Sequence, residues 1–260
     1  MPSATIAGVS FDVAATAYDR FMGRYSIRLS PQLADLAGVQ AGQRVLDVGC
    51  GPGALTAELL ARTGAGNVAA VDPSAPFVAA AAARYPGVDV RQASAEQLPF
   101  EDDAFDVALA QLVVHFMTDP VRGIAEMARV VRPGGVVAAC VWDHAGSNGP
   151  LSSFWEAARS MDPSVADESH LPGVREGHLA SLFGAAGLHS IESSVLSADL
   201  EHPSFDSWWQ PFTEGVGPAG VYVAGLSPER RAELRERCRA SLPGGPFTVV
   251  ARAWAARAEA

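Results

Sequence analysis

The segment 45–53, with the sequence VLDVGCGPG, constrains the fold more than any other part of this chain. Its apolar residues predict a buried strand, its glycines predict a tight turn, and residues 54–62 have the periodicity of a helix. A strand, a glycine turn and a helix in this order place backbone N–H groups and a helix N-terminus around a bound nucleotide. Glycine is needed because a Cβ would block either a positive-φ turn or the close approach of the ligand.

Two kinds of nucleotide ligand fit this segment. Gly49, Gly51 and Ala54 nearly match the dinucleotide fingerprint, and Asp72 lies about 20 residues further on, where a ribose-binding acid belongs. Asp47 favours the second kind, S-adenosylmethionine. A carboxylate just before the turn repels a pyrophosphate, whereas it attracts a sulfonium and an α-ammonium group.

The same segment resembles the first motif of class I S-adenosylmethionine-dependent methyltransferases. The resemblance covers residues 11–198, with its specific motifs within 45–142. It is close to the broad group of small-molecule methyltransferases that includes enzymes of the ubiquinone and menaquinone pathways. The resemblance implies S-adenosyl-L-methionine as the cofactor, S-adenosyl-L-homocysteine as the product, and no metal.

Apolar runs that alternate with helical patterns predict an α/β fold. The first five expected strands occupy 44–48, 67–71, 88–92, 105–111 and 136–142. Helices are expected near 54–63, 75–84 and 120–131. This alternation indicates a parallel sheet covered by helices on both faces. With two later strands at 188–198 and 247–255 it becomes a Rossmann-like, seven-stranded, mostly parallel sheet, whose last strand the resemblance implies to be antiparallel.

The N-terminal part and two later stretches are expected to lie outside this sheet. Residues 1–43 predict a helical segment, in which Pro31 opens a helix that Gly38 ends. The resemblance implies that this segment forms a cap over the cofactor site. Residues 44–260 then form the core domain, with helical lid insertions near 145–175 and 199–245.

The resemblance also implies where the cofactor contacts lie. Asp72 is expected to accept both ribose hydroxyls, since Ser74 suits the alternative role of helix cap better. The turn from Ser94 to Glu96 is expected to hold the adenine, with Ser94 where many relatives have an acid. The full set of candidate cofactor-binding residues is Tyr18, Arg24, Asp47, Gly49, Cys50, Gly51, Asp72, Pro73, Ser94, Ala95, Glu96 and Gln111.

Some of these candidates have a plainer interpretation. Tyr18 and Arg24 either contact the cofactor, the arginine through its carboxylate, or belong to an amphipathic helix that packs on the sheet. Gln111 ends a strand where open α/β sheets bind ligands, but a strand end also faces solvent. Trp208, Trp209 and Phe212 either line an apolar substrate cavity or bury a lid helix.

Three residues are candidates for a general base, namely His115, Asp143 and His144. His115 follows the fourth expected strand, and the other two follow the fifth, at the edge where substrates bind in this fold. The plainer alternative for His115 is a structural histidine bonded to backbone. For Asp143 and His144 it is a solvated loop. A base is needed only for acceptors that lose a proton.

Composition narrows the function classes. The formal net charge of −10 disfavours nucleic acid and anionic membranes as partners, and the resemblance implies a small-molecule acceptor. Three widely spaced cysteines indicate neither disulfides nor a zinc site, and together with the lack of a secretion signal they predict a cytoplasmic protein. A monomer or a homodimer is expected, and the sequence does not distinguish the two.

The predicted function is methyl transfer from S-adenosylmethionine to an oxygen, nitrogen or carbon atom of a small molecule. The sulfonium makes the methyl group electrophilic, so positioning and exclusion of water carry most of the catalysis. Two alternatives stay open. One is a methyltransferase-like protein that binds the cofactor without methyl transfer, and the other is an NAD-dependent oxidoreductase, which Asp47 disfavours.

Overall fold

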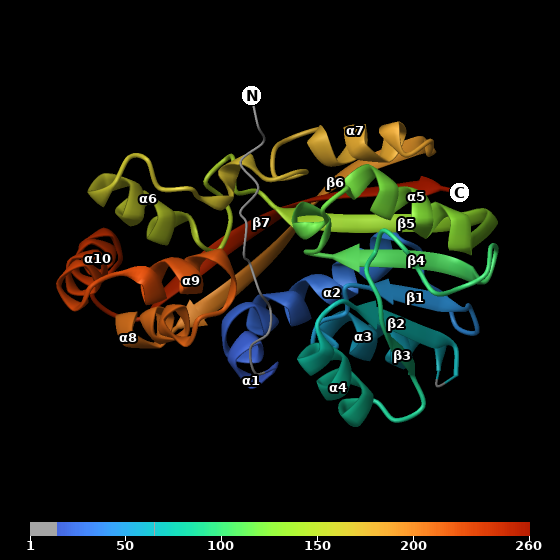
Figure 1. The fold of residues 1–260 in the computed structure, drawn as a ribbon, viewed down its shortest axis with the longest axis horizontal. Helices are drawn as coiled ribbons and strands as arrows, with labels where there is room; N and C mark the ends of the chain where they lie inside the picture. Colours follow the sequence, from blue (N-terminus) through green and yellow to red (C-terminus); the bar gives the residue numbers. More distant parts are fainter. Residues whose placement is uncertain (1–14, 65) are drawn as a thin grey trace.

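The computed structural model describes residues 15–64 and 66–260, and a seven-stranded sheet forms its centre (Figure 1). The strand order is β3-β2-β1-β4-β5-β7-β6, and β7 runs antiparallel to both of its neighbours. The strands are β1 (Val45–Val48), β2 (Val68–Asp72), β3 (Asp89–Gln92), β4 (Phe105–Gln111), β5 (Val131–Trp142), β6 (His189–His202) and β7 (Phe247–Glu259). The predicted Rossmann-like, mostly parallel sheet with an antiparallel last strand is therefore confirmed.

Helices cover both faces of the sheet. Residues of α2 (Arg24–Leu36) and α3 (Ala54–Thr63) pack into the core on one face. Residues of α5 (Pro120–Val130) and α7 (His178–Ala185) pack into the core on the other. Helix α4 (Ala75–Arg84) lies beside β2 and β3, at the edge of the sheet. Helices α3 and α4 have the predicted bounds, and Ser74 caps α4 by accepting a hydrogen bond from the Phe77 amide.

Strand β5 begins earlier than predicted. The expected strand starts at residue 136, but Val131 already pairs with Phe105 of β4. The next pair joins Val136 to Val107, so the intervening residues of β5 bulge out of the ladder. Gly134, at a φ of +75°, permits the bulge.

The start of helix α2 also differs from the prediction. Pro31 does not open a helix but lies inside α2, which starts seven residues earlier at Arg24. Leu29 and Leu33 of this helix are fully buried against the sheet, and their packing outweighs the hydrogen bond that proline removes. The carbonyl left without its helical donor belongs to Ile27, which is exposed and so within reach of water.

Replacing Pro31 by alanine is expected to raise the free energy of unfolding by about 2 kcal/mol. A proline inside a helix costs about 3 kcal/mol, and up to about 1 kcal/mol returns when its restriction of the unfolded chain is lost. Denaturant unfolding at equilibrium measures the change. The matched control is Pro120→Ala, because Pro120 occupies the first turn of α5, where proline is tolerated. A Pro31→Ala protein no more stable than the parent would contradict the argument.

A lid region lies beside the carboxyl-terminal edge of the sheet and consists of α6 (Ser152–Met161), α8 (Phe205–Trp209), α9 (Gly217–Gly225) and α10 (Pro228–Ser241) (Figure 1). It has its own apolar core, in which the rings of Phe154 and Phe212 stack with centroids 4.6 Å apart. Two segments supply it, one between β5 and β6 and one between β6 and β7.

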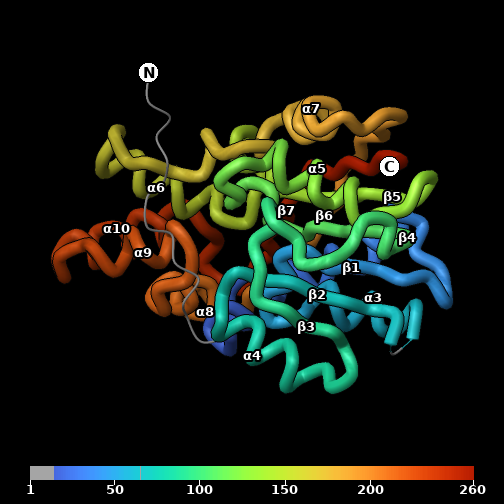
Figure 2. The backbone as a smooth tube through the Cα atoms, turned by 45° about the vertical axis from the view of Figure 1, so that its right-hand side comes forward, coloured from blue at the N-terminus to red at the C-terminus, as the bar shows by residue number. Residues whose placement is uncertain are grey.

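The N-terminal helices join the lid region to the sheet. The short α1 (Ala15–Tyr18) leads into a π-helical turn (Asp19–Gly23), and the Phe21 ring of that turn contacts Phe212 edge-on. Arg20 of the same turn donates to the carboxylate of Glu214 at 2.8 Å. The N-terminal helices and residues 212–214, which are far apart in the sequence, thus lie side by side (Figure 2). Within the described residues, no helix combines the length and the apolar character needed to cross a membrane.

Candidate functional site

A cavity of about 850 Å³ opens where the strands from β1 to β5 end. Its walls come from four places: the N-terminal helices, the turns after these strands, the loop that carries Glu168, and the start of α9. This is the edge at which open α/β sheets bind their ligands. Most of the candidate residues from the sequence meet here.

The glycine turn after β1 forms one wall. Gly49 and Gly51 line the cavity at φ values of +72° and +53°. The N–H groups of Gly49 and Cys50 donate to the Val71 carbonyl of β2 at 2.8 and 2.9 Å, which holds the turn against the sheet. A Cβ on Gly49 would approach the Val113 side chain to 2.4 Å, so this glycine is required by the protein's own packing.

Asp72, the last residue of β2, presents a buried carboxylate at the cavity wall. One oxygen accepts the Gly51 N–H at 2.8 Å and the other accepts the Ser74 N–H at 2.9 Å. Burial raises the pKa of this carboxyl, although both backbone donors act against the shift. The acid is therefore held rigidly beside the glycine turn.

Asp47 lies deeper, in a small pocket that adjoins the cavity and that Cys50 also lines. Its carboxylate accepts a hydrogen bond from the Thr56 hydroxyl at 2.6 Å. Burial raises the pKa of Asp47 to about 7, with a further contribution from the charge of Asp72. A cation bound nearby would relieve the cost of ionising both acids.

The turn after β3 forms another part of the wall, with Ser94, Ala95 and Glu96 in the lining, and Pro73 lines the cavity from the turn after β2. The Ser94 hydroxyl donates to the Glu96 carboxylate at 2.6 Å, and the other carboxylate oxygen accepts the Thr118 N–H at 2.8 Å. Burial opposes ionisation of Glu96, but these hydrogen bonds outweigh it and lower its pKa. Glu96 thus stays anionic and ties two loops together.

Two further candidates line the cavity from the middle of the molecule. Gln111, at the end of β4, donates through Nε2 to the Ser26 carbonyl at 3.1 Å, and its buried Oε1 has no partner among the described residues. Tyr18 lines the cavity from α1, and its ring contacts Phe77 edge-on.

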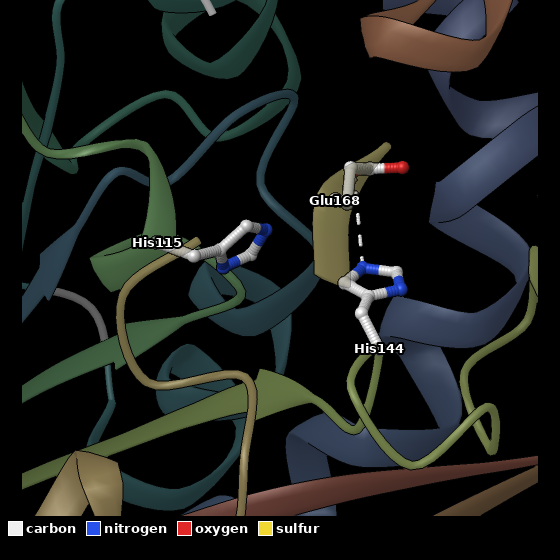
Figure 3. Close-up of side chains that lie close together, drawn as sticks. All are labelled: His115, His144 and Glu168. Carbon is white, nitrogen blue, oxygen red and sulfur yellow. Dashed lines mark ion pairs between the residues drawn. The ribbon is translucent and has the colours of Figure 1, made fainter. Parts of the chain in front are cut away.

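His115, His144 and Glu168 meet at the far wall of the cavity (Figure 3). His115 lies in a short helical turn after β4, His144 follows β5, and Glu168 comes from the loop after α6. All three side chains are buried. Burial lowers the pKa of His144 to about 4 and that of His115 well below its usual value, so both rings are neutral at pH 7.

The contact between His144 and Glu168, dashed in Figure 3, joins Nε2 to Oε1 at 3.8 Å. This distance is too long for a hydrogen bond. Because the His144 ring is neutral, the contact is not an ion pair either. Burial raises the pKa of Glu168 to about 7, although its Oε2 accepts the Trp155 indole N–H at 2.9 Å.

The structure places two candidates outside both the cavity and the adjoining pocket. Arg24 donates instead to the backbone carbonyl of Glu201 at 3.3 Å. Asp143 accepts the Gly146 N–H at 2.9 Å and the Asn148 side-chain N–H at 2.7 Å, so its carboxylate shapes the loop that carries His144. The aromatic pair Trp208 and Phe212 is buried in the lid core, as the plainer interpretation held.

Sequence reasoning missed Glu168 and the start of α9. Glu168 stands among other polar residues in a loop without periodicity, so no sequence pattern distinguishes it. The glycine-rich segment that starts at Gly215 leads into helix α9, which begins at Gly217, and Val216–Ala219 line the cavity. Pro218 in the first turn of that helix was the available signal.

Comparison with known proteins gives a consistent result. A family model described as a methyltransferase domain matches residues 46–139. An uncharacterized methyltransferase of Mycobacterium sp. (strain JLS) is 31% identical over 212 residues, which are 76% of this chain and 82% of that protein. An uncharacterized methyltransferase of Mycobacterium tuberculosis is 36% identical over 135 residues, 52% of each chain, so this chain spans about half the length of that relative.

Solved structures show the same fold. The YcgJ protein of Bacillus subtilis superimposes with a TM-score of 0.57 and 22% sequence identity, over 88% of this chain and 97% of that one. At this identity the likeness concerns the fold alone.

Proposed function

Because this chain belongs to the class I S-adenosylmethionine-dependent methyltransferases, we propose that it transfers a methyl group from that cofactor to a small-molecule acceptor. One observation carries the proposal most strongly. The glycine turn after β1 and the buried carboxylate of Asp72 line the same cavity, at the carboxyl ends of the strands. The cavity volume of about 850 Å³ is in the range of ligand sites and leaves room for an acceptor beside the cofactor.

The residues of the cavity divide between the parts of the cofactor. We assign the ribose hydroxyls to Asp72, whose oxygens each keep a free lone pair beside their backbone donors. The turn from Ser94 to Glu96 is assigned to the adenine. Asp47 supplies negative charge below the glycine turn, where the sulfonium and the α-ammonium group would be attracted.

Methyl transfer needs no covalent intermediate with the protein. A lone pair of the acceptor forms the new bond to the methyl carbon while the sulfur–carbon bond breaks and its electron pair stays on sulfur, which yields S-adenosylhomocysteine. The protein contributes by holding the acceptor in line behind the methyl group and by excluding water. We place the acceptor at His115, His144 and Glu168, because these polar side chains lie on the cavity wall apart from the proposed cofactor contacts.

Calorimetric titration tests the cofactor assignment, and turnover tests the reaction. We expect micromolar binding of S-adenosylmethionine and S-adenosylhomocysteine, and no binding of NAD. Formation of S-adenosylhomocysteine is then followed by mass spectrometry with a panel of small hydroxyl, amine and carbon acceptors. Binding of NAD alone would overturn the proposal, and tight cofactor binding without turnover on any acceptor would favour a protein that uses the cofactor differently.

Cofactor affinity is expected to rise with pH up to about 7 and then to level off. The pKa of Asp47 is raised to about 7, so this acid is largely protonated at about pH 5. A cationic cofactor favours the ionised form of Asp47, so binding releases a proton. The cofactor affinity therefore rises by up to about tenfold per pH unit below the pKa of Asp47. Titrations of the parent and of Asp47→Asn between about pH 5 and pH 8 measure this. The variant should give a flatter profile, and an equally steep one would exclude Asp47 as the cause.

A further inference from the structure

His115, His144 and Glu168 have the arrangement of a ligand set rather than of a hydrogen-bonded network. One nitrogen of each histidine and one oxygen of the glutamate lie within 4.8 Å of one another. The three side chains come from three separate loops and converge on one wall of the cavity (Figure 3). No short sequence spacing connects them, which is why the sequence predicted no metal site.

Two nitrogen atoms of this cluster lack partners in the protein. His115 Nδ1 and His144 Nε2 are buried, and neither has a hydrogen-bond partner among the described residues. Buried polar atoms normally have one, and the unpaired His144 Nε2 is the nitrogen that lies 3.8 Å from Glu168 Oε1, where a cation between the two would bind both. The rings of the two histidines lie close, with centroids 6.1 Å apart.

The charges around the site favour a cation. Both imidazoles are neutral, because burial lowers their pKa values, and a neutral ring offers the lone pair that a metal requires. Burial also disfavours the carboxylate of Glu168, which a bound cation would stabilise. Asp143 and Asp167 act on His144 electrostatically from the flanking loops, while Arg159, the nearby positive group, is paired with Asp167. A proton on His144 or on Glu168 would provide a partner for only one of the two unpaired nitrogens, His115 Nδ1 and His144 Nε2.

We propose that His115, His144 and Glu168 bind one divalent first-row transition cation, with Zn²⁺ as the representative. Two imidazoles and one carboxylate are a recognised donor set for catalytic metal sites, and they leave coordination positions open. Ligands at about 2.1 Å from a tetrahedral ion lie about 3.4 Å apart, so the longest separation must shorten by about 1.4 Å. Adjustment of side chains on three loops accommodates that change.

Because His115, His144 and Glu168 line the cavity, the coordination positions they leave open would be reached from it. An acceptor oxygen, such as that of a hydroxyl or an enol, would bind there and lose its proton to water more readily. This role rests on the proposed methyl transfer, whereas binding of the cation does not. The inference thus narrows the acceptor class to molecules with an oxygen at or beside the methylated atom.

The experiment measures cation binding without any reaction. The full chain is treated with a chelator, dialysed and titrated with ZnCl₂ by calorimetry, and the visible absorption of the Co²⁺-loaded protein reports the ligands. We expect one equivalent to bind, with affinity lowered by roughly 100-fold or more in Glu168→Gln and in His144→Ala. The matched control is His189→Ala, which removes an exposed histidine on β6 and should leave affinity unchanged.

Two readouts separate loss of ligands from loss of fold. Glu168→Gln keeps an oxygen that can accept from Trp155, so its thermal midpoint without metal should stay near that of the parent. Addition of Zn²⁺ should raise the midpoint of the parent and of His189→Ala but not that of Glu168→Gln. Absence of stoichiometric binding, or equal affinity in Glu168→Gln, would overturn the metal site. If cofactor binding and turnover persist in that case, the proposed function stands without the metal.

Discussion

Replacement of Asp72 by alanine is expected to weaken binding of S-adenosylmethionine roughly 1,000-fold. In the proposed complex its carboxylate accepts hydrogen bonds from both ribose hydroxyls, and each hydrogen bond to a charged group contributes about 1.5–3 kcal/mol. The sum, after relaxation of the neighbouring loop, is about 4 kcal/mol. The carboxylate is already oriented by the N–H groups of Gly51 and Ser74, so little additional ordering opposes the interaction.

Calorimetry on matched variants measures this effect. Asp199→Ala serves as the control, because Asp199 is an exposed acid on β6, outside the cavity lining. Asp72→Asn tests the charge separately, since it keeps one oxygen for the backbone donors, and it should fall between the parent and Asp72→Ala. Denaturant unfolding of each variant shows whether the turn has collapsed. An Asp72→Ala protein that folds and binds the cofactor as tightly as the parent would exclude Asp72 from the ribose site.

Replacement of Gly49 by alanine is expected to lower the free energy of unfolding by about 4 kcal/mol. A non-glycine residue at its φ of +72° costs about 1–2 kcal/mol. The new Cβ would also approach Val113 Cγ2 to 2.4 Å, and such overpacking adds about 1–3 kcal/mol. Because Val113 also lines the cavity, its displacement should weaken cofactor binding as well.

Two further variants divide this effect into its causes. Gly38→Ala isolates the backbone cost, since Gly38 has a similar φ of +67° but its Cβ would meet nothing within 4 Å. It should lose only about 1–2 kcal/mol. Val113→Ala, combined with Gly49→Ala, removes the two closest atoms, Cγ2 and Cγ1, although Cβ stays at 3.0 Å, and it should recover part of the loss that Gly49→Ala alone produces. Equal destabilisation by Gly38→Ala and Gly49→Ala would show that packing against Val113 contributes nothing.

The candidate cofactor site was largely predictable, because its parts follow directly after predicted strands. In a parallel sheet the carboxyl ends of neighbouring strands meet at one edge, so the turns after β1, β2 and β3 were expected to come together. The structure brings nine of the predicted residues into the cavity lining, namely Tyr18, Gly49, Gly51, Asp72, Pro73, Ser94, Ala95, Glu96 and Gln111. Asp47 and Cys50 line the adjoining pocket instead.

Arg24 and Asp143 show where the same reasoning stops. Both residues belong to segments that were expected at the ligand-binding edge of the sheet. The direction of each side chain, however, depends on partners that the local sequence does not specify. Arg24 reaches the backbone of Glu201, on strand β6. Asp143 turns back to Gly146 and Asn148, since a short polar side chain readily bonds to the backbone of its own loop.

The sequence by itself determined the α/β class, most of the strands and helices of the core, and the glycine turn with its acids. These depend on local periodicity and on spacing within a few residues, which any folded copy of the chain must respect. Only the tertiary structure decided that Pro31 stays inside a helix, because packing of Leu29 and Leu33 against the sheet outweighs the local preference.

The tertiary structure also decided that Glu168 joins His115 and His144. These three residues are far apart in the chain and belong to loops that carry no periodic signal, so their meeting depends on how the loop after α6 folds back over the ends of β4 and β5. Long-range contacts of this kind arise from the summed packing of the core and the lid region, which no local pattern encodes.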